Sequence, residues 1–209
     1  IDAQGLVKSA VVARLARGKR FGFGKGSTKE PVAWAYQYPK KVARDQHAVK
    51  RLRALFAQCF HYPEPDSDPD YGIAAFFGPA EIKENIMFVH GTTWPSKHWP
   101  ETYWIELAKI VTGAGLKVSV PSGNQAERER AERIARVSPL IEVLPKMHLT
   151  ELAKIIAKTK AVVAVDTGLS HLAAALNIPT VTLYGPTDPD KIGHAVAERR
   201  RIDFRTAKS

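Results

Sequence analysis

The 209-residue sequence predicts an α/β protein built on a doubly wound parallel sheet. From about residue 86 onward, short β-rich apolar runs alternate with stretches of helical periodicity. The run at 161–165 stops at Asp166-Thr167-Gly168, and a helical pattern begins at once. Because parallel strands need long crossover connections, repeated units of this kind place helices on both faces of one sheet.

Five strands and four helices are expected in this part of the chain. The strands are Ile86–His90, Leu116–Val120, Ile141–Leu144, Ala161–Val165 and Thr180–Tyr184. The helices are Glu101–Thr112, Gln125–Val137, Leu149–Lys158 and Leu169–Leu176. The usual strand order, 3-2-1-4-5, puts a switch point between the first and fourth strands, where ligands bind beyond the carboxyl ends.

An acidic, proline-rich segment at 61–70 reads as a linker between two units. Before it, the sequence predicts an amphipathic helix at Leu6–Arg17 and a second helix at Asp45–Phe60, joined by an irregular glycine-rich loop. After residue 190 the structural signal is weak. The expected divisions are residues 1–70, 71–190 and a C-terminal segment, 191–209.

The formal net charge of +10 lies entirely in residues 1–60, which hold 13 Lys and Arg against three acids. Such a segment attracts a phosphorylated substrate, an anionic membrane face or nucleic acid, or it merely solubilises the surface. No nucleic-acid motif accompanies the charge, so nucleic acid is not an expected partner. The single Cys59 excludes a disulfide framework and a cysteine-based zinc site. No apolar run reaches the roughly 18 residues of a membrane-spanning helix.

Two polar loops should converge at the switch point. The loop after the first strand carries Thr92, Thr93 and Lys97, which offer two hydroxyls and a cation to a diphosphate. Opposite it, Asp166-Thr167-Gly168 precedes a helix whose N-terminus suits an anion. Asp166 has two open interpretations, binding sugar hydroxyls or capping that helix. His171, in the first turn, reaches a phosphate or serves a structural role.

Two further residues follow the second and third strands. Glu127 suits a ribose hydroxyl, although it also fits a plain charged helix start. Met147 lies against a nucleobase or fills the core. Two other patterns are rejected: Gly22-Phe-Gly24-Lys-Gly26 lacks the third glycine of a dinucleotide fingerprint, and Asp66-Ser67-Asp68 lies in the linker. No metal site is expected.

Three motifs together resemble the ADP-heptose:lipopolysaccharide heptosyltransferase family over about residues 1–190. They are Thr92-Thr93 with Lys97-His98-Trp99-Pro100, then Asp166-Thr167-Gly168-Leu169-Ser170-His171, then Tyr184-Gly185-Pro186-Thr187-Asp188-Pro189. The opening Ile1–Ser9 and the segment 46–49 also fit. Enzymes that add the second heptose usually carry a different loop before the lysine, so those that add the first heptose match better.

The resemblance implies the GT-B architecture, two Rossmann-like domains of which the first is incomplete here. Residues 1–70 would belong to the acceptor-binding domain and residues 71–190 would form the donor-binding domain. The implied activity is inverting, metal-independent transfer of L-glycero-D-manno-heptose from ADP-heptose to the Kdo of the lipid A inner core. No cofactor is implied, and the protein would work in the cytoplasm, peripheral to the inner membrane.

The resemblance also implies roles for single residues. Lys97 and Asp166 would be catalytic, and Asp166 would meet the heptose. The donor would be bound by Thr92, Thr93, Lys97, Glu127, Met147, Asp166, Thr167, Gly168 and His171. The resemblance also implies that the family's first strands, its opening glycine-containing loop and the Asp proposed as general base would precede residue 1. A nucleotide-sugar-binding module without activity therefore stays open as an alternative.

The basic first segment would then dock the phosphates of the lipid acceptor. The residues proposed for this are Lys25, Lys29, Arg44, Arg51 and Arg53.

Overall fold

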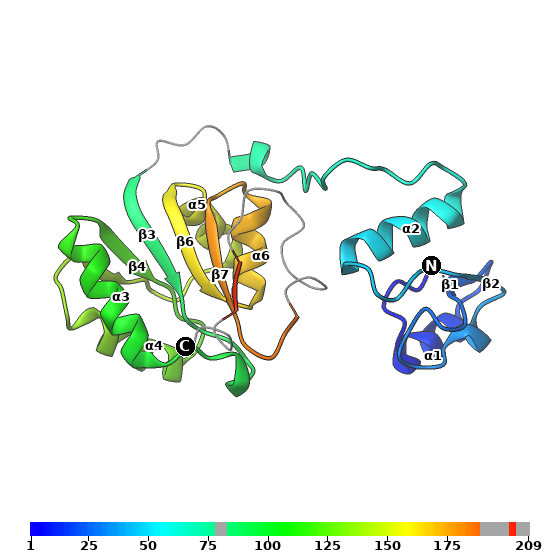
Figure 1. The fold of residues 1–209 in the computed structure, drawn as a ribbon, viewed down its shortest axis with the longest axis horizontal. Helices are drawn as coiled ribbons and strands as arrows, with labels where there is room; N and C mark the ends of the chain where they lie inside the picture. Colours follow the sequence, from blue (N-terminus) through cyan, green and yellow to red (C-terminus); the bar gives the residue numbers. More distant parts are fainter. Residues whose placement is uncertain (78–82, 189–200, 204–209) are drawn as a thin grey trace. The chain divides into compact units, whose positions relative to one another are not determined.

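The structure, a computed structural model, describes residues 1–77, 83–188 and 201–203 (Figure 1). The chain divides into two compact units at the junction of Pro69 and Asp70. Each unit is described by itself. Among the helices that the structure describes, none combines the length and the apolar character needed to cross a membrane.

The second unit is built on a parallel six-stranded sheet (Figure 1). Its strands are β3 (Lys83–Val89), β4 (Lys117–Val120), β5 (Ile141–Val143), β6 (Thr159–Val165), β7 (Thr180–Tyr184) and β8 (Arg201–Asp203). Their spatial order is β5-β4-β3-β6-β7-β8, which confirms the predicted 3-2-1-4-5 order for the first five. β8 was not predicted, and it extends the sheet by pairing with β7.

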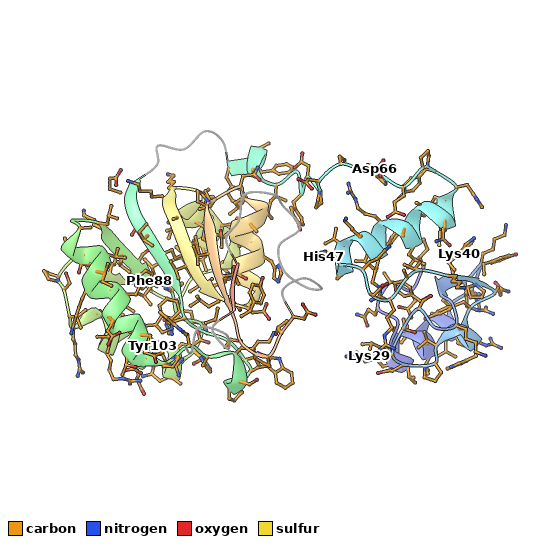
Figure 2. All side chains as sticks on the ribbon, in the orientation of Figure 1. Lys29, Lys40, His47, Asp66, Phe88 and Tyr103 are labelled. Carbon is orange, nitrogen blue, oxygen red and sulfur yellow. The ribbon has the colours of Figure 1, made fainter. Side chains whose placement is uncertain are left out.

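Four helices cover the two faces of this sheet. They are α3 (Glu101–Gly113), α4 (Gln125–Ala135), α5 (Leu149–Ile156) and α6 (Gly168–Ala175). Phe88, labelled in Figure 2, packs with Trp104 of α3 and Ile134 of α4. Met87, the neighbouring residue in β3, packs with α5 and α6 on the opposite face. This alternation is the period-two pattern of a strand buried on both sides.

The first unit contains two helices and a small parallel sheet. Its elements are α1 (Val7–Leu15), β1 (Phe21–Phe23), η1 (Ala33–Ala35), β2 (Tyr38–Lys40) and α2 (Ala48–Phe60). The predicted irregular loop around Gly22 is wrong, because Gly22 lies in β1 and pairs with Pro39. The amphipathic description of the first helix is also wrong: Val12 and Leu15 are 69% and 80% exposed, and Ala10 is its buried residue.

Gly22 makes room for the aromatic ring that organises the first unit. A Cβ atom at this position would lie 2.5 Å from the Tyr36 ring. The Tyr36 hydroxyl donates a 2.8 Å hydrogen bond to the Asp2 carboxylate, so the ring cannot easily move aside. A missing side chain in β1 is therefore a packing requirement, which explains a glycine inside a strand.

Gly22→Ala should lower the free energy of unfolding of the first unit by about 1–3 kcal/mol, because the added methyl overpacks the site. Gly113→Ala is the control, since its added Cβ meets no atom within 4 Å at the end of α3. Urea denaturation of both variants measures the difference. A wild-type midpoint for the unfolding of the first unit in Gly22→Ala would contradict the packing requirement.

His90 follows β3 and is fully buried against Trp104, with ring centroids 6.5 Å apart. Neither ring nitrogen has a hydrogen-bond partner among the described residues. Burial, reinforced by the nearby Arg130 guanidinium, lowers the pKa of His90 to about 4. The ring is therefore neutral in the folded protein at pH values where an exposed histidine would be charged.

Stability should consequently fall in acid. Between pH 6.5 and 4 the unfolded chain binds a proton at His90 that the folded protein rejects, so stability is complete above 6.5 and declines toward 4. The expected loss from this group is about 3 kcal/mol. His90→Leu should remove this part of the pH dependence. Urea titrations of both proteins at pH 7 and pH 4.5 measure this. If the free energy of unfolding of the variant falls as much as that of the wild type, the role of His90 is refuted.

Candidate active site

A cavity of about 270 Å³ opens at the carboxyl ends of the central strands of the second unit. The polypeptide segments that follow β3, β4, β5 and β6 all contribute to its wall. The lining residues are Val89, Gly91, Thr92, Thr93, Pro121, Ser122, Gly123, Glu127, Pro145, Lys146, Met147, Leu149, Leu152, Thr167 and Leu169. The cavity therefore lies at the predicted switch point between β3 and β6.

Five of the nine predicted binding residues line this cavity: Thr92, Thr93, Glu127, Met147 and Thr167. The other four, Lys97, Asp166, Gly168 and His171, lie on the η3 turn and at the start of α6, outside the lining. Except for Met147, the sequence analysis missed the residues of the apolar wall, and it also missed Lys146. Their position in the chain could have identified them, because they follow the carboxyl ends of predicted strands, as the predicted binding residues do.

Lys97 and Asp166 form an ion pair next to this cavity. The Lys97 Nζ lies 2.6 Å from Asp166 Oδ2, and the Asp166 side chain is only 5% exposed. The short helix η3 (Pro95–Lys97) presents the lysine, and its backbone N–H bonds to the carbonyl of Trp94. A buried carboxylate needs such a partner, because an uncompensated charge in this position costs several kcal/mol. The pair joins the two predicted polar loops directly.

The helix that follows Asp166 begins at Gly168, one residue earlier than predicted, and its N-cap is Thr167. The capping interpretation of Asp166 is therefore wrong. Ser170 Oγ donates a 2.7 Å hydrogen bond to the Thr167 carbonyl and closes the first turn. A Cβ at Gly168 would meet no atom within 4 Å, so this face of the helix start is open.

His171, in the same turn, points one ring nitrogen toward the ion pair. Its Nε2 lies 3.9 Å from Asp166 Oδ1, the carboxylate oxygen that Lys97 does not hold. The start of α6 thus combines a lysine, a histidine and the positive end of a helix. This is an arrangement that attracts anionic oxygens.

Glu127 reaches from α4 across the cavity wall. Asn124 caps α4 by accepting a 2.9 Å hydrogen bond from the Glu127 N–H. The Glu127 carboxylate accepts a 2.7 Å bond from the Gly123 N–H and lies over Gly91, where a Cβ would approach it to 2.6 Å. This carboxylate faces the cavity. Its side chain is partly buried, in contrast to the exposed Arg128 and Glu129 beside it.

Met147 occupies the apolar side of the cavity. It lines the wall with Leu149 and Leu152, and it also packs against the core beneath α5. The two interpretations of this residue are therefore compatible. An apolar wall, a carboxylate, two hydroxyls and a cation together suit a flat ring linked through a sugar to phosphates.

Metal ligands are not grouped at this cavity. Within residues 1–77, 83–188 and 201–203 the structure places no cluster of three or more His, Cys, Asp or Glu side chains that could hold a metal. Ser67, in the middle of the rejected Asp-Ser-Asp motif, accepts a hydrogen bond from Arg53 through its carbonyl.

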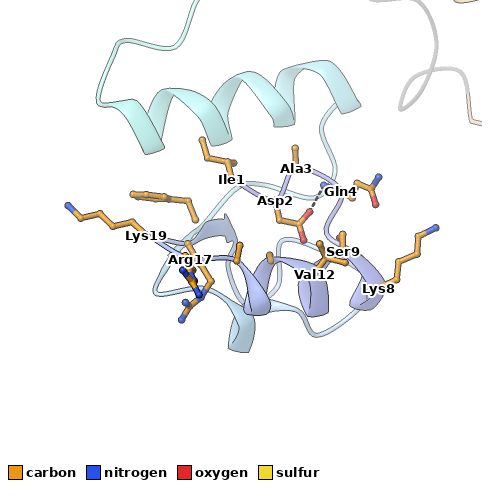
Figure 3. A pocket seen from close by; sticks show the side chains of 13 residues that line it. Ile1, Asp2, Ala3, Gln4, Lys8, Ser9, Val12, Arg17 and Lys19 are labelled. Carbon is orange, nitrogen blue, oxygen red and sulfur yellow. Dashed lines mark hydrogen bonds between the residues drawn. The ribbon is translucent and has the colours of Figure 1, made fainter.

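The first unit has hollows of its own. One of them has a volume of about 730 Å³, and its lining includes Lys8, Arg17 and Lys19. Figure 3 shows these cations together with Asp2 and Gln4 of the same lining. Lys25 and Lys29 line a second hollow, of about 400 Å³.

Two of the proposed acceptor-docking arginines already have structural partners within the first unit. Arg51 bonds to the Ser27 carbonyl and lies 5.0 Å from the centre of the Phe23 ring. Arg53 bonds to the Ser67 carbonyl.

The chain is similar to known glycosyltransferases. Residues 1–206 match the family model of glycosyltransferase family 9 (heptosyltransferase). Lipopolysaccharide heptosyltransferase 1 of Escherichia coli K12 is 47% identical over 198 residues, which is 92% of this chain and 62% of that protein. The chain thus spans about three fifths of the length of this curated relative.

Two solved structures resemble the chain closely. E. coli heptosyltransferase WaaC with ADP superposes with a TM-score of 0.89 at 44% identity, covering 96% of this chain and 64% of that one. WaaC with ADP-2-deoxy-2-fluoro heptose gives 0.83 at 42% identity, covering 94% and 67%. The likeness confirms the predicted GT-B fold class. The chain therefore belongs to glycosyltransferase family 9, the heptosyltransferases.

Proposed function

We propose that this chain carries the donor site of a lipopolysaccharide heptosyltransferase that transfers L-glycero-D-manno-heptose from ADP-heptose to the Kdo of the lipid A inner core. The proposal places the enzyme among those that add the first heptose, as the 47% identity to heptosyltransferase 1 supports. The observation that carries it is the Lys97–Asp166 ion pair beside the open start of α6.

The cavity accommodates the ADP part of the donor in this proposal. The adenine lies against Met147, and a ribose hydroxyl donates to the Glu127 carboxylate, which the Gly123 N–H holds in place. The diphosphate then lies between the hydroxyls of Thr92 and Thr93, Lys97 and the first turn of α6. Both structures of WaaC that resemble this chain contain ADP or an ADP-heptose analogue, which supports this class of ligand.

Transfer breaks the bond between the anomeric carbon and the β-phosphate oxygen, and its electron pair leaves with ADP. The acceptor hydroxyl oxygen attacks the same carbon from the opposite face, which inverts its configuration, and the hydroxyl proton passes to a base. Lys97, with the N-terminal end of α6, stabilises the charge that develops on ADP. This fixed positive charge is our reason to propose a metal-independent reaction without a cofactor.

Asp166 has two tasks in this mechanism. Its Oδ2 orients Lys97, and its Oδ1 accepts a hydrogen bond from a heptose hydroxyl. His171 lies near that second oxygen and contacts the phosphate edge of the donor. An ion-paired, acceptor-only carboxylate fits a positioning task better than proton abstraction.

The first unit supplies the acceptor surface in this proposal. Lys25, Lys29 and the basic rim of the hollow in Figure 3 offer cations to the phosphates of the lipid. The same charge would hold the protein at the cytoplasmic face of the inner membrane as a peripheral protein. Exposed Trp34 lies on the rim of the second hollow, where an aromatic side chain suits a membrane interface.

Lys97→Ala should reduce kcat/KM for heptose transfer about 100-fold or more, because it removes a charge that stabilises the leaving ADP. Lys160→Ala is a matched control: it breaks a 2.6 Å ion pair with Glu84 on the exposed surface of the same unit. Transfer by the full-length protein should stay at the wild-type rate in that control. Unchanged turnover in the Lys97 variant would defeat the assignment, and ADP-heptose binding without transfer by the wild type would favour a binding module.

Glu127→Gln should weaken ADP binding about tenfold or more, because a hydrogen bond to a charged group is lost. The same substitution should abolish the preference for ADP over its 2′- or 3′-deoxy analogues. Glu129→Gln, an exposed change on the same helix that alters a contact with Gln125, serves as the control. Calorimetry with the three nucleotides tests this, and a preserved ribose preference in Glu127→Gln would exclude the proposed contact.

A further inference from the structure

The loop between β3 and α3 carries the polar residues of the site, yet much of it is exposed. Thr93, Trp94, Pro95 and Ser96 are all exposed, and the Trp94 side chain is 65% accessible. Lys97 nevertheless has to meet a diphosphate at one defined place. A loop of this kind needs an anchor, because a 1 Å misplacement of a catalytic group is costly.

His98 provides a side-chain anchor immediately after Lys97. Its Nδ1 lies 2.7 Å from the Arg130 Nη1 of α4, and its ring also hydrogen-bonds to the backbone of His90. The ring thus links the end of the loop to His90, where the loop begins after β3, and to Arg130 of α4.

Arg130 is itself held by α3, since its Nε lies 3.9 Å from the Glu101 carboxylate. Arg133 forms a second link between the same two helices through two hydrogen bonds to Glu101, of 2.7 and 2.8 Å. The Arg130 link reaches the loop through His98, whereas the Arg133 link joins helix to helix. The two arginines therefore allow the anchor to be separated from helix packing.

We propose that His98, held by Arg130, is a positioning residue that places Lys97 against the diphosphate of the donor. The catalytic part of this inference, the placement of Lys97 against the diphosphate, rests on the proposed function. The anchoring of the loop by His98 and Arg130 does not depend on it. His98 acts through Lys97 and needs no contact with the donor itself.

The anchor requires a neutral ring. A guanidinium only donates hydrogen bonds, so His98 Nδ1 has to accept one and cannot carry a proton. The groups that face this ring are Arg130 and Glu127 of α4 and His90 at the end of β3. Burial and the Arg130 charge lower the pKa of His98, while the His90 backbone and Glu127 oppose the shift. Acid should therefore release the loop.

The test compares His98→Ala, His98→Gln and Arg133→Ala in the full-length protein. Glutamine can accept from Arg130 and donate to the His90 backbone, but it does not titrate. ADP-heptose is the probe, because its diphosphate diester does not change charge between pH 5 and 8. Calorimetry measures its dissociation constant across that range, and hydrogen exchange measures the backbone protection of residues 91–97 without ligand.

His98→Ala should weaken ADP-heptose binding about tenfold, the size of one hydrogen bond to a charged group, and speed exchange at residues 91–97. His98→Gln should bind as the wild type does at pH 7 and lose less affinity than the wild type toward pH 5. Arg133→Ala should leave both the affinity and the exchange of the loop unchanged, although it removes a link between α3 and α4.

Unchanged exchange at residues 91–97 in His98→Ala would overturn the inference. So would an equal loss of affinity in Arg133→Ala, since that would assign the effect to helix packing. If His98→Ala does not fold, His98→Gln tests the inference instead. A glutamine variant that loses as much affinity for ADP-heptose toward pH 5 as the wild type does would refute the anchor. If the wild type does not bind ADP-heptose, the proposed function is wrong. Hydrogen exchange at residues 91–97 then still tests whether His98 anchors the loop.

Discussion

The pairing of β3 with β6 at the centre of the parallel sheet is the constraint on which the site depends. The two strands run in register from Ile86 opposite Ala161 to Val89 opposite Ala164. Because both strands point the same way, the loop with Lys97 and the corner with Asp166 emerge at one edge. Two residues 69 positions apart in the chain thereby come within 2.6 Å. The cavity, the ion pair and the open helix start all follow from this one pairing.

Three polar side chains at this edge are each held by a defined partner. Asp166 is buried against Lys97, the Glu127 carboxylate is fixed by the Gly123 N–H, and His98 is fixed by Arg130. His90 is the contrasting case, a buried ring that stays neutral because burial and the Arg130 charge outweigh the nearby carboxylates of Glu127 and Glu101. Groups that are oriented before a ligand arrives need little reorganisation when it binds. The site is thus prepared for a negatively charged ligand by contacts far apart in sequence.

Most of the second unit was predictable because its signals are local. The run Ala161–Val165, the turn at Asp166 and the helix after it are adjacent in the chain, and strand order follows from the regular alternation. β8 was missed because a three-residue edge strand has too few residues to show a period, and its pairing with β7 is not local. β1 and β2 were missed for the same reason, and a glycine in β1 hid it further. The N-cap of α6 is Thr167, one residue after Asp166, and the Asp166 carboxylate forms an ion pair with Lys97 instead of capping the helix.

The sequence by itself determined the α/β class, the order of the five main strands and the set of residues at their carboxyl ends. These depend on periodicity and on polar residues placed after apolar runs, which are properties of neighbouring positions. Only the tertiary structure decided that Asp166 pairs with Lys97, that Glu127 lies over Gly91 and that His98 meets Arg130. Each of these contacts joins separate elements of the fold, and their distances are set by packing of the sheet and helices rather than by any local pattern.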